Sequence, residues 1–99
     1  MEYSKSILQQ EKVCMVCKTT MDLERHHVFT GPRRRTSEKY GLWVWLCHEH
    51  HTGSQGVHFN REFMEELHDY AQRAFEAEYG EEEFLKIFGK NYKKGEYVG

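Results

Sequence analysis

The stretch Leu42-Trp43-Val44-Trp45-Leu46-Cys47-His48-Glu49-His50-His51 decides how this chain folds. Its first half is a run of five apolar residues behind a glycine, which predicts a β-strand over 42–46. Its second half places a thiol and an imidazole with two residues between them, at Cys47 and His50, and a second histidine, His51, directly after them. The predicted strand therefore leads straight into side chains that bind metals.

A matching pair lies upstream, where two residues again separate Cys14 from Cys17. Three thiolates and one imidazole form a ligand set suited to tetrahedral zinc. The alternative is that the first two cysteines are small core residues, but the repeated spacing favours zinc. The 29 residues between the pairs exceed a zinc-ribbon loop, so we expect them to hold a unit such as a β-hairpin. Its first strand would end in His26-His27-Val28-Phe29, before a turn at Gly31-Pro32.

The composition allows one small domain. The chain has 99 residues, of which 38% are hydrophobic and 30% are charged, so its core is small and a metal ion would help to stabilise it. It contains no apolar run of transmembrane or signal-peptide length, so we expect no membrane partner and a cytoplasmic location. Three cysteines cannot all pair as disulfides, which also favours metal binding.

The net charge of −2 hides an uneven distribution. Residues 1–56 carry eight basic and six acidic side chains, whereas residues 57–99 carry six basic and ten acidic ones. The first part also holds all three cysteines and five of the seven histidines, so we expect the chemistry there. A uniformly basic nucleic-acid-binding protein is excluded, but a local basic patch is not. The candidate patch is a polar loop that either binds phosphates or is simply solvated, and it comprises Arg33, Arg34, Arg35 and Lys39.

The second part of the sequence is helical in pattern. Asn60 is a good N-cap, and apolar residues at three-to-four spacing behind it predict an amphipathic helix of about 20 residues that ends at Gly80. A shorter helix is expected over 81–88, with Gly89 as its C-cap. Residues 1–11 are expected to form a short helix or an arm, and the tail 90–99 to be frayed. The prediction is a single α+β domain over residues 1–99.

Histidines beyond the zinc set suggest catalysis. The side chains of His26 and His27 would point to opposite faces of a strand. One could bind a metal and the other act as a general base only if the backbone twists there. An imidazole with a pKa near 6.5 is well suited to activating water at neutral pH. Zinc at the neighbouring His50 would fix the position of His51. We expect His48 and His68 to be ordinary surface or core residues.

Taken together, these motifs resemble the zinc-containing HNH endonucleases of the ββα-metal superfamily, and in particular small phage and prophage proteins. The likeness covers roughly residues 12–60 and is carried by Cys-x2-Cys, Glu-Arg-His-His-Val-Phe (24–29) and Leu-Cys-x2-His-His (46–51). It implies a ββα-metal core with a structural zinc, followed by the C-terminal amphipathic helix over about 60–89. It also implies a phage- or prophage-encoded protein in a bacterial cell, with DNA as its partner and a homodimer as an allowed state.

The resemblance also implies a role for each matching residue. His27 matches the general base, while His26 and His51 match ligands of a catalytic divalent metal, which is Mg²⁺, Mn²⁺, Ni²⁺ or Zn²⁺. His58 stays open as a third ligand. The basic run would hold the DNA backbone. The structural zinc ligands would be Cys14, Cys17, Cys47 and His50.

One departure from the family keeps other functions open. The middle Asn of the HNH pattern should fall within 40–42, and no Asn is there. Ser37 or a backbone carbonyl could substitute for it. The alternatives are a catalytically degenerate, zinc-stabilised nucleic-acid-binding or protein-adaptor module, and a structural zinc domain that docks through its acidic helix, 61–79. For Trp43 and Trp45, core packing is favoured over stacking on bases.

Overall fold

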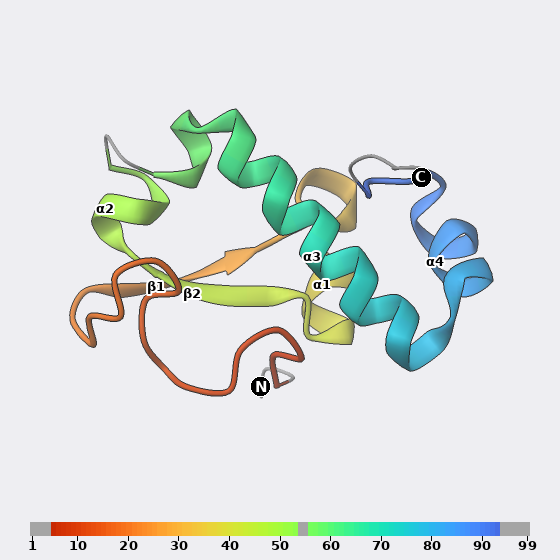
Figure 1. Cartoon of the computed structure of the whole chain (residues 1–99), viewed down its shortest axis with the longest axis horizontal. Helices are drawn as coiled ribbons and strands as arrows, with labels where there is room; N and C mark the ends of the chain where they lie inside the picture. Colours follow the sequence, from red (N-terminus) through yellow and green to blue (C-terminus); the bar gives the residue numbers. More distant parts are fainter. Residues whose placement is uncertain (1–4, 54–55, 94–99) are drawn as a thin grey trace, which may run out of the picture.

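The computed structural model describes residues 5–53 and 56–93. These residues form a small mixed α+β structure with a two-stranded antiparallel sheet and four α-helices (Figure 1). Among them, no helix is both long and apolar enough to cross a membrane. In chain order, the strands and α-helices are β1 (Leu23–His27), α1 (Arg34–Tyr40), β2 (Trp43–Cys47), α2 (His48–His51), α3 (Arg61–Tyr79) and α4 (Glu81–Phe88).

The two strands pair along their whole length, with His26 opposite Val44. Side chains alternate between the faces of a strand, so Val44 and Leu46 share one face and Trp43 and Trp45 the other. Val44 and Leu46 are fully buried in the main hydrophobic core. Trp43 is buried, in line with the prediction of packing, whereas Trp45 is half-buried, and neither belongs to this core cluster. The predicted strand over 42–46 is confirmed with a shift of one residue.

The basic run is helical, so its prediction as a polar loop is wrong. A 3-10 turn over Gly31–Arg33 contains Pro32, whose fixed φ suits the first turn of a helix, and leads into α1. Ser37 of α1 is fully buried and bonds to the backbone of Phe29. The helix ends at Gly41, which has a φ of 73° and would place a Cβ against the carbonyl of Lys5. The strands are therefore joined through a helix and not by a tight hairpin.

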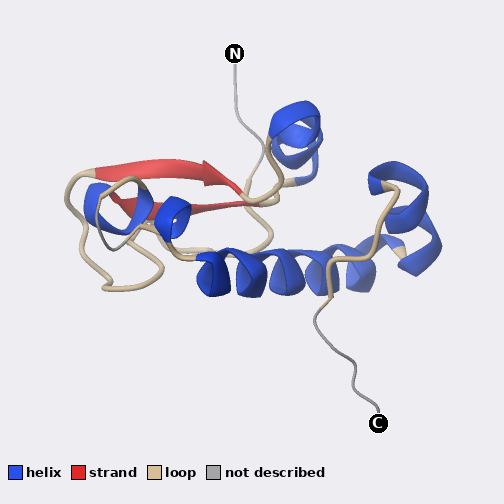
Figure 2. Ribbon diagram, turned by 90° about the horizontal axis from the view of Figure 1, so that it is seen from above, coloured by secondary structure: helices blue, strands red, loops and turns tan. Residues whose placement is uncertain are grey.

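The two C-terminal helices are confirmed. The side chain of Asn60 accepts a hydrogen bond of 3.0 Å from the N–H of Phe63, which caps α3 at the predicted residue. Figure 2 shows this long helix running along one side of the sheet. Its buried Leu67 and Phe75 join Val44 and Leu46 in the core, which therefore lies between α3 and one face of the sheet.

The described N-terminal residues form an arm of bends without a helix. Leu8 is buried in the core, and the N–H of Ile7 donates to the carbonyl of Gly41 at 2.9 Å. The side-chain oxygen of Gln9 accepts from the N–H of Trp45 at 2.8 Å. The arm is thus fixed against β2. Residues 1–4 lie outside the described residues.

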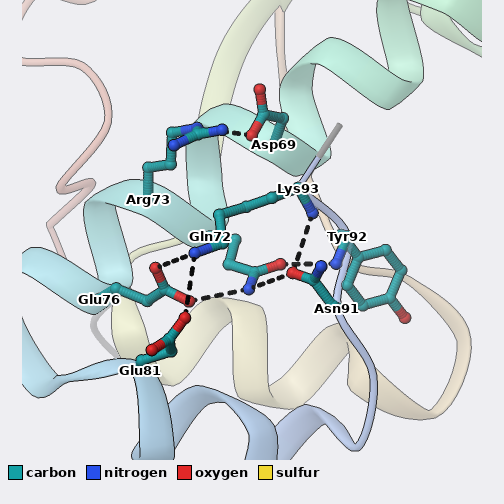
Figure 3. A network of polar contacts seen from close by, with 8 residues as sticks. All are labelled: Asp69, Gln72, Arg73, Glu76, Glu81, Asn91, Tyr92 and Lys93. Atoms are coloured by element: carbon teal, nitrogen blue, oxygen red, sulfur yellow. Dashed lines mark hydrogen bonds and ion pairs between the residues drawn. The ribbon is translucent and has the colours of Figure 1, made fainter. Parts of the chain in front are cut away.

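Residues 90–93 are held against α3, although the sequence predicts a frayed tail from residue 90 (Figure 3). Buried Gln72 accepts from the N–H of Tyr92 at 2.6 Å and donates to Asn91 at 2.9 Å. Lys93 forms an ion pair of 2.9 Å with Glu76. These contacts hold residues 91–93 against α3. The rest of the predicted tail, 94–99, lies outside the described residues.

Candidate metal centres and active site

The four predicted zinc ligands lie together at one end of the sheet. One ligand atom from each of them falls within 4.8 Å of all the others. The sulfurs of Cys17 and Cys47 are 3.8 Å apart, and Nδ1 of His50 lies 3.7 Å from the sulfur of Cys14 and 3.2 Å from that of Cys47. Ligand sulfurs around a tetrahedral zinc, with Zn–S bonds of about 2.3 Å, are about 3.8 Å apart. This group could therefore bind a metal ion such as zinc.

Backbone contacts hold the first pair of this group in place. The N–H of Cys14 donates to the carbonyl of Thr19 and the N–H of Lys18 to that of Cys14, both at 2.9 Å, which closes a tight turn around the two thiols. The N–H of Met15 donates to the carbonyl of Trp45 at 2.9 Å. The turn is thereby tied to β2, whose last residue, Cys47, supplies the third thiol. The fourth ligand follows at once in α2.

The environment of Cys14 favours its thiolate. Burial alone would raise the pKa of this thiol, but hydrogen bonds from the backbone N–H groups of Cys17, Cys47 and Val16 lower it to about 6. Burial raises the pKa of Cys47, and so do the neighbouring thiols. A thiolate is the form that binds metals, and a divalent cation would offset the repulsion between several of them.

A second group consists of His26, His51 and His58. One ring nitrogen from each lies within 4.8 Å of the other two, and the ring centroids are 4.9 to 5.4 Å apart. His26 comes from β1 and His51 from α2, while His58 lies in a 3-10 turn over Val57–Phe59. His58, which the sequence left open, is therefore placed with the other two. Three converging imidazoles are a second possible metal site.

Two of these histidines, His26 and His58, favour their neutral form. Burial, together with the nearby His51 and His58, lowers the pKa of His26 to about 3. Burial and the proximity of His51 also lower the pKa of His58. A neutral imidazole keeps the lone pair that a metal needs.

Glu24 orients the second group, a role that sequence reasoning missed. Its carboxylate accepts from Nδ1 of His51 at 2.7 Å and from Nδ1 of exposed His48 at 3.2 Å, and these bonds lower the pKa of Glu24. Because Nδ1–H of His51 is engaged, its Nε2 is free to bind a metal. The sequence does contain a signal for this role, because Glu24 precedes His26 by two residues and therefore lies on the same face of the strand.

His27 lies beside this group with a carboxylate partner of its own. Its Nε2 is 2.7 Å from Oε1 of Glu38 in α1, a partner that sequence reasoning also missed. Although His26 and His27 leave the strand on opposite faces, both line one small cavity of about 210 Å³. The lining residues of this cavity are Arg25, His26, His27, Thr30, Arg34, His51 and His58.

Ser37 does not replace the missing Asn at this cavity. Its hydroxyl donates to the carbonyl of Phe29 at 2.8 Å and accepts from the N–H of the same residue at 3.0 Å. It therefore fixes the backbone two residues after His27. The contact to the His27 ring comes from the next residue, Glu38.

The four predicted nucleic-acid-binding side chains differ in placement. Arg34 is exposed and lines the histidine cavity. Arg33 is half-buried and donates to the carbonyl of Phe88 at the end of α4, at 3.5 Å. Arg35 and Lys39 are exposed on α1. The structure thus brings Arg34 to the candidate site and gives Arg33 a contact with the C-terminal helix.

Comparisons of the chain with protein-family models, with curated proteins and with solved structures find no match. Its function must be inferred from the two groups of ligands and the cavity between β1, α1 and α2.

Proposed function

We propose that this protein is a metal-dependent endonuclease of the HNH type that hydrolyses phosphodiester bonds in DNA. One observation carries the proposal: three histidines converge on a cavity that also contains His27, which is paired with a carboxylate. A metal site and a general base next to one another are the parts that metal-assisted hydrolysis requires. The order β1, β2, α2, with ligands from β1 and α2, supports a ββα-metal fold.

His27 acts as the general base. Its Nε2–H donates to Glu38, which leaves Nδ1 with the lone pair that accepts a proton from the attacking water. The carboxylate holds the ring in this tautomer and stabilises the imidazolium that forms, as the aspartate does in a catalytic triad. Glu38 thus takes over the orienting function for which the family uses its middle Asn.

His26, His51 and His58 hold the catalytic ion. A divalent metal bound there would supply positive charge to a phosphoryl oxygen and to the leaving 3′ oxygen. Imidazole ligands suit Zn²⁺ and Ni²⁺ better than Mg²⁺, which prefers oxygen. We therefore expect activity with Ni²⁺ or Zn²⁺ to exceed activity with Mg²⁺.

Arg34 binds the phosphate backbone at the cavity, because its planar guanidinium can contact phosphate oxygens in a bidentate manner. The thiol-rich group carries a structural zinc that holds α2, and with it His51, next to β1. The contact of Arg34 with phosphate would position DNA without reading its sequence.

Nicking of supercoiled plasmid tests the proposal. We expect nicks with at least one of Ni²⁺, Mn²⁺, Zn²⁺ and Mg²⁺, and a rate for His27→Ala lower by about 10²- to 10⁴-fold, the usual contribution of a general base. The control is Lys86→Gln, because Lys86 is exposed on α4 and does not line the cavity. If wild type and His27→Ala are equally inert in every metal while both still bind DNA, the protein is instead a zinc-stabilised binding module. If neither binds DNA, a protein-docking role for α3 is favoured.

A further inference from the structure

A second, larger cavity lies on the face of the sheet that α3 does not cover. Its volume is about 550 Å³, within the range of about 300–1,000 Å³ that is typical of small-molecule pockets. Trp43 and Trp45 of β2 form one wall, and Lys5, Gln9 and Lys12 of the N-terminal arm contribute to the other. Neither the histidines nor the thiols of the two metal groups line it.

The walls of this pocket are already ordered. The rings of Trp43 and Trp45 meet edge to face, with centroids 5.3 Å apart. Both polar atoms of the Gln9 side chain are engaged, one by the carbonyl of Val13 at 2.6 Å and the other by the N–H of Trp45 at 2.8 Å. Trp45 remains partly exposed to the cavity, so its ring can still be covered by a ligand.

The lining defines the chemistry of the ligand. Lys12 lies 4.9 Å from the centre of the Trp45 ring, and Lys5 provides a second positive charge. Among the described residues, no carboxylate lines this cavity. An aromatic surface flanked by lysines fits a flat ring joined to a negatively charged group, as a base is joined to a phosphate in a nucleotide.

Arg25 connects this pocket to the histidine cavity. Its guanidinium carbon lies 3.7 Å from the centre of the Trp43 ring and 5.4 Å from that of Trp45. The same residue lines the cavity that contains His26 and His27. Arg25 therefore lies between the two sites, in contact with the tryptophans of one and in the lining of the other, and we expect one nucleic-acid strand to reach both.

We propose that the pocket between Trp45 and the lysines of the arm binds one unpaired nucleotide of the substrate strand, next to the phosphodiester that is cleaved. The bases of an intact duplex are stacked on each other and cannot offer a face to Trp45, so the substrate has a single-stranded segment at this point. This proposal rests on the proposed nuclease function and names the structure of its substrate.

The test uses the fluorescence of the protein itself. Trp43 and Trp45 are the two tryptophans of the chain, so the intrinsic emission reports directly on the pocket. The zinc-loaded protein, without added catalytic metal, is titrated with a short oligothymidine, with a blunt hairpin duplex and with heparin. We expect the oligothymidine to quench the emission and to bind about tenfold or more tightly than the duplex. Heparin carries charge without bases and should leave the emission unchanged.

Variants separate stacking from charge. Trp45→Ala should weaken binding of a labelled oligothymidine by about five-fold to a hundred-fold, the usual effect of losing one stacking ring. Trp45→Phe, which keeps a ring, should retain most of the affinity, so a loss that Phe restores is not a folding defect. Lys12→Gln should also weaken binding, whereas Lys86→Gln, an exposed lysine on α4, should not. Equal binding by Trp45→Ala and wild type, a preference for the duplex, or equal quenching by heparin would overturn the proposal.

The two proposals fail in different ways. If the oligothymidine binds and quenches but no metal supports cleavage, the nuclease function is wrong and the nucleotide pocket stands. If plasmid is nicked while the tryptophan emission ignores single-stranded DNA, the pocket is wrong and the nuclease function stands.

Discussion

At the scale of single residues, the carboxylate of Glu24 orients a member of the histidine group. It accepts a hydrogen bond of 2.7 Å from Nδ1 of His51, which directly follows His50 of the thiol-rich group. Removal of such an orienting partner typically costs about 10- to 100-fold in metal affinity or activity. We therefore expect Glu24→Ala to raise the concentration of Ni²⁺ or Mn²⁺ needed for half-maximal nicking by about that factor, and calorimetric titration of the zinc-loaded protein to show the same loss.

The control for this prediction is Glu82→Ala, which removes an exposed carboxylate from α4, far along the chain from both groups. An unchanged metal requirement in Glu24→Ala, with the fold intact by circular dichroism, would show that His51 does not need its carboxylate.

The sequence identifies candidate site residues more readily than the side chains that hydrogen-bond to them. Cys14, Cys17, Cys47 and His50 can be found in the sequence because their chemistry is rare and their spacing repeats. Glu38, in contrast, reaches His27 from α1 only after the chain has turned back on itself. A carboxylate is common on protein surfaces, so nothing local marks this one as the partner of a histidine.

At the scale of elements, the N-terminus of α3 depends on a local cap. The side chain of Asn60 accepts from the N–H of Phe63, and loss of such a cap costs about 1 kcal/mol. Asn60→Ala should lower the melting temperature by about 4–8 °C, the shift expected for that energy in a domain of this size. Asn60→Asp keeps the acceptor and should melt close to wild type. Equal losses in both variants would mean that the cap is not the cause.

His68 makes the attachment of α3 to the end of β1 sensitive to pH. Its ring stacks on that of Phe29, with the ring centroids 5.1 Å apart, and its Nε2 bonds to the carbonyl of Val28 at 3.0 Å. Burial lowers the pKa of His68 from 6.5; the Val28 carbonyl and Glu65 act against this shift, and Lys90 adds to it.

The sign of the pH effect follows from proton binding. Between the lowered pKa and 6.5 the unfolded chain binds a proton that the folded ring does not, so this part of the stability is fully present above pH 6.5 and is lost as the pH falls below it. Melting temperatures from about pH 7.5 down to 5.5 should therefore fall less in His68→Gln than in wild type. The control Lys86→Gln, which changes an exposed lysine on α4, should keep the wild-type slope, and equal slopes in all three proteins would contradict the assignment.

Elements with local end signals can be predicted, and those fixed by distant contacts cannot. Asn60 and Gly80 frame α3 within the sequence itself, so its limits are confirmed almost to the residue. The run over 33–39 looks like a solvated loop because of its charges. It becomes helical because Pro32 favours a helical turn, Ser37 is anchored on Phe29, and Gly41 can end the helix against the arm.

At the scale of the whole molecule, the thiol-rich group joins three segments of the chain, namely the turn with Cys14 and Cys17, the end of β2 and α2. The turn with Cys14 and Cys17 is otherwise held to the sheet by backbone bonds, such as the one from Met15 to Trp45. Cys47 and His50 span the passage from β2 to α2. A zinc ion here would bind the N-terminal turn, the sheet and the helix that carries His51 into one unit.

Removal of the zinc should therefore unfold the domain and not merely loosen one loop. Structural zinc contributes about 10–16 kcal/mol in small metal-binding peptides, which is as large as the total stability of many domains. A chelator that removes the metal, verified by elemental analysis, should abolish the cooperative thermal transition and most of the helical circular dichroism. Readdition of Zn²⁺ should restore both.

Cys17→Ser provides the sharpest variant, because Cys17 is exposed and its replacement removes a ligand with little loss of packing. It should behave like the chelated protein, whereas the change Val16→Ser at the exposed neighbouring position should melt like wild type. A metal-free protein with an unchanged melting temperature would show that the core between α3 and the sheet is sufficient for folding, and that the four ligands serve some purpose other than stability.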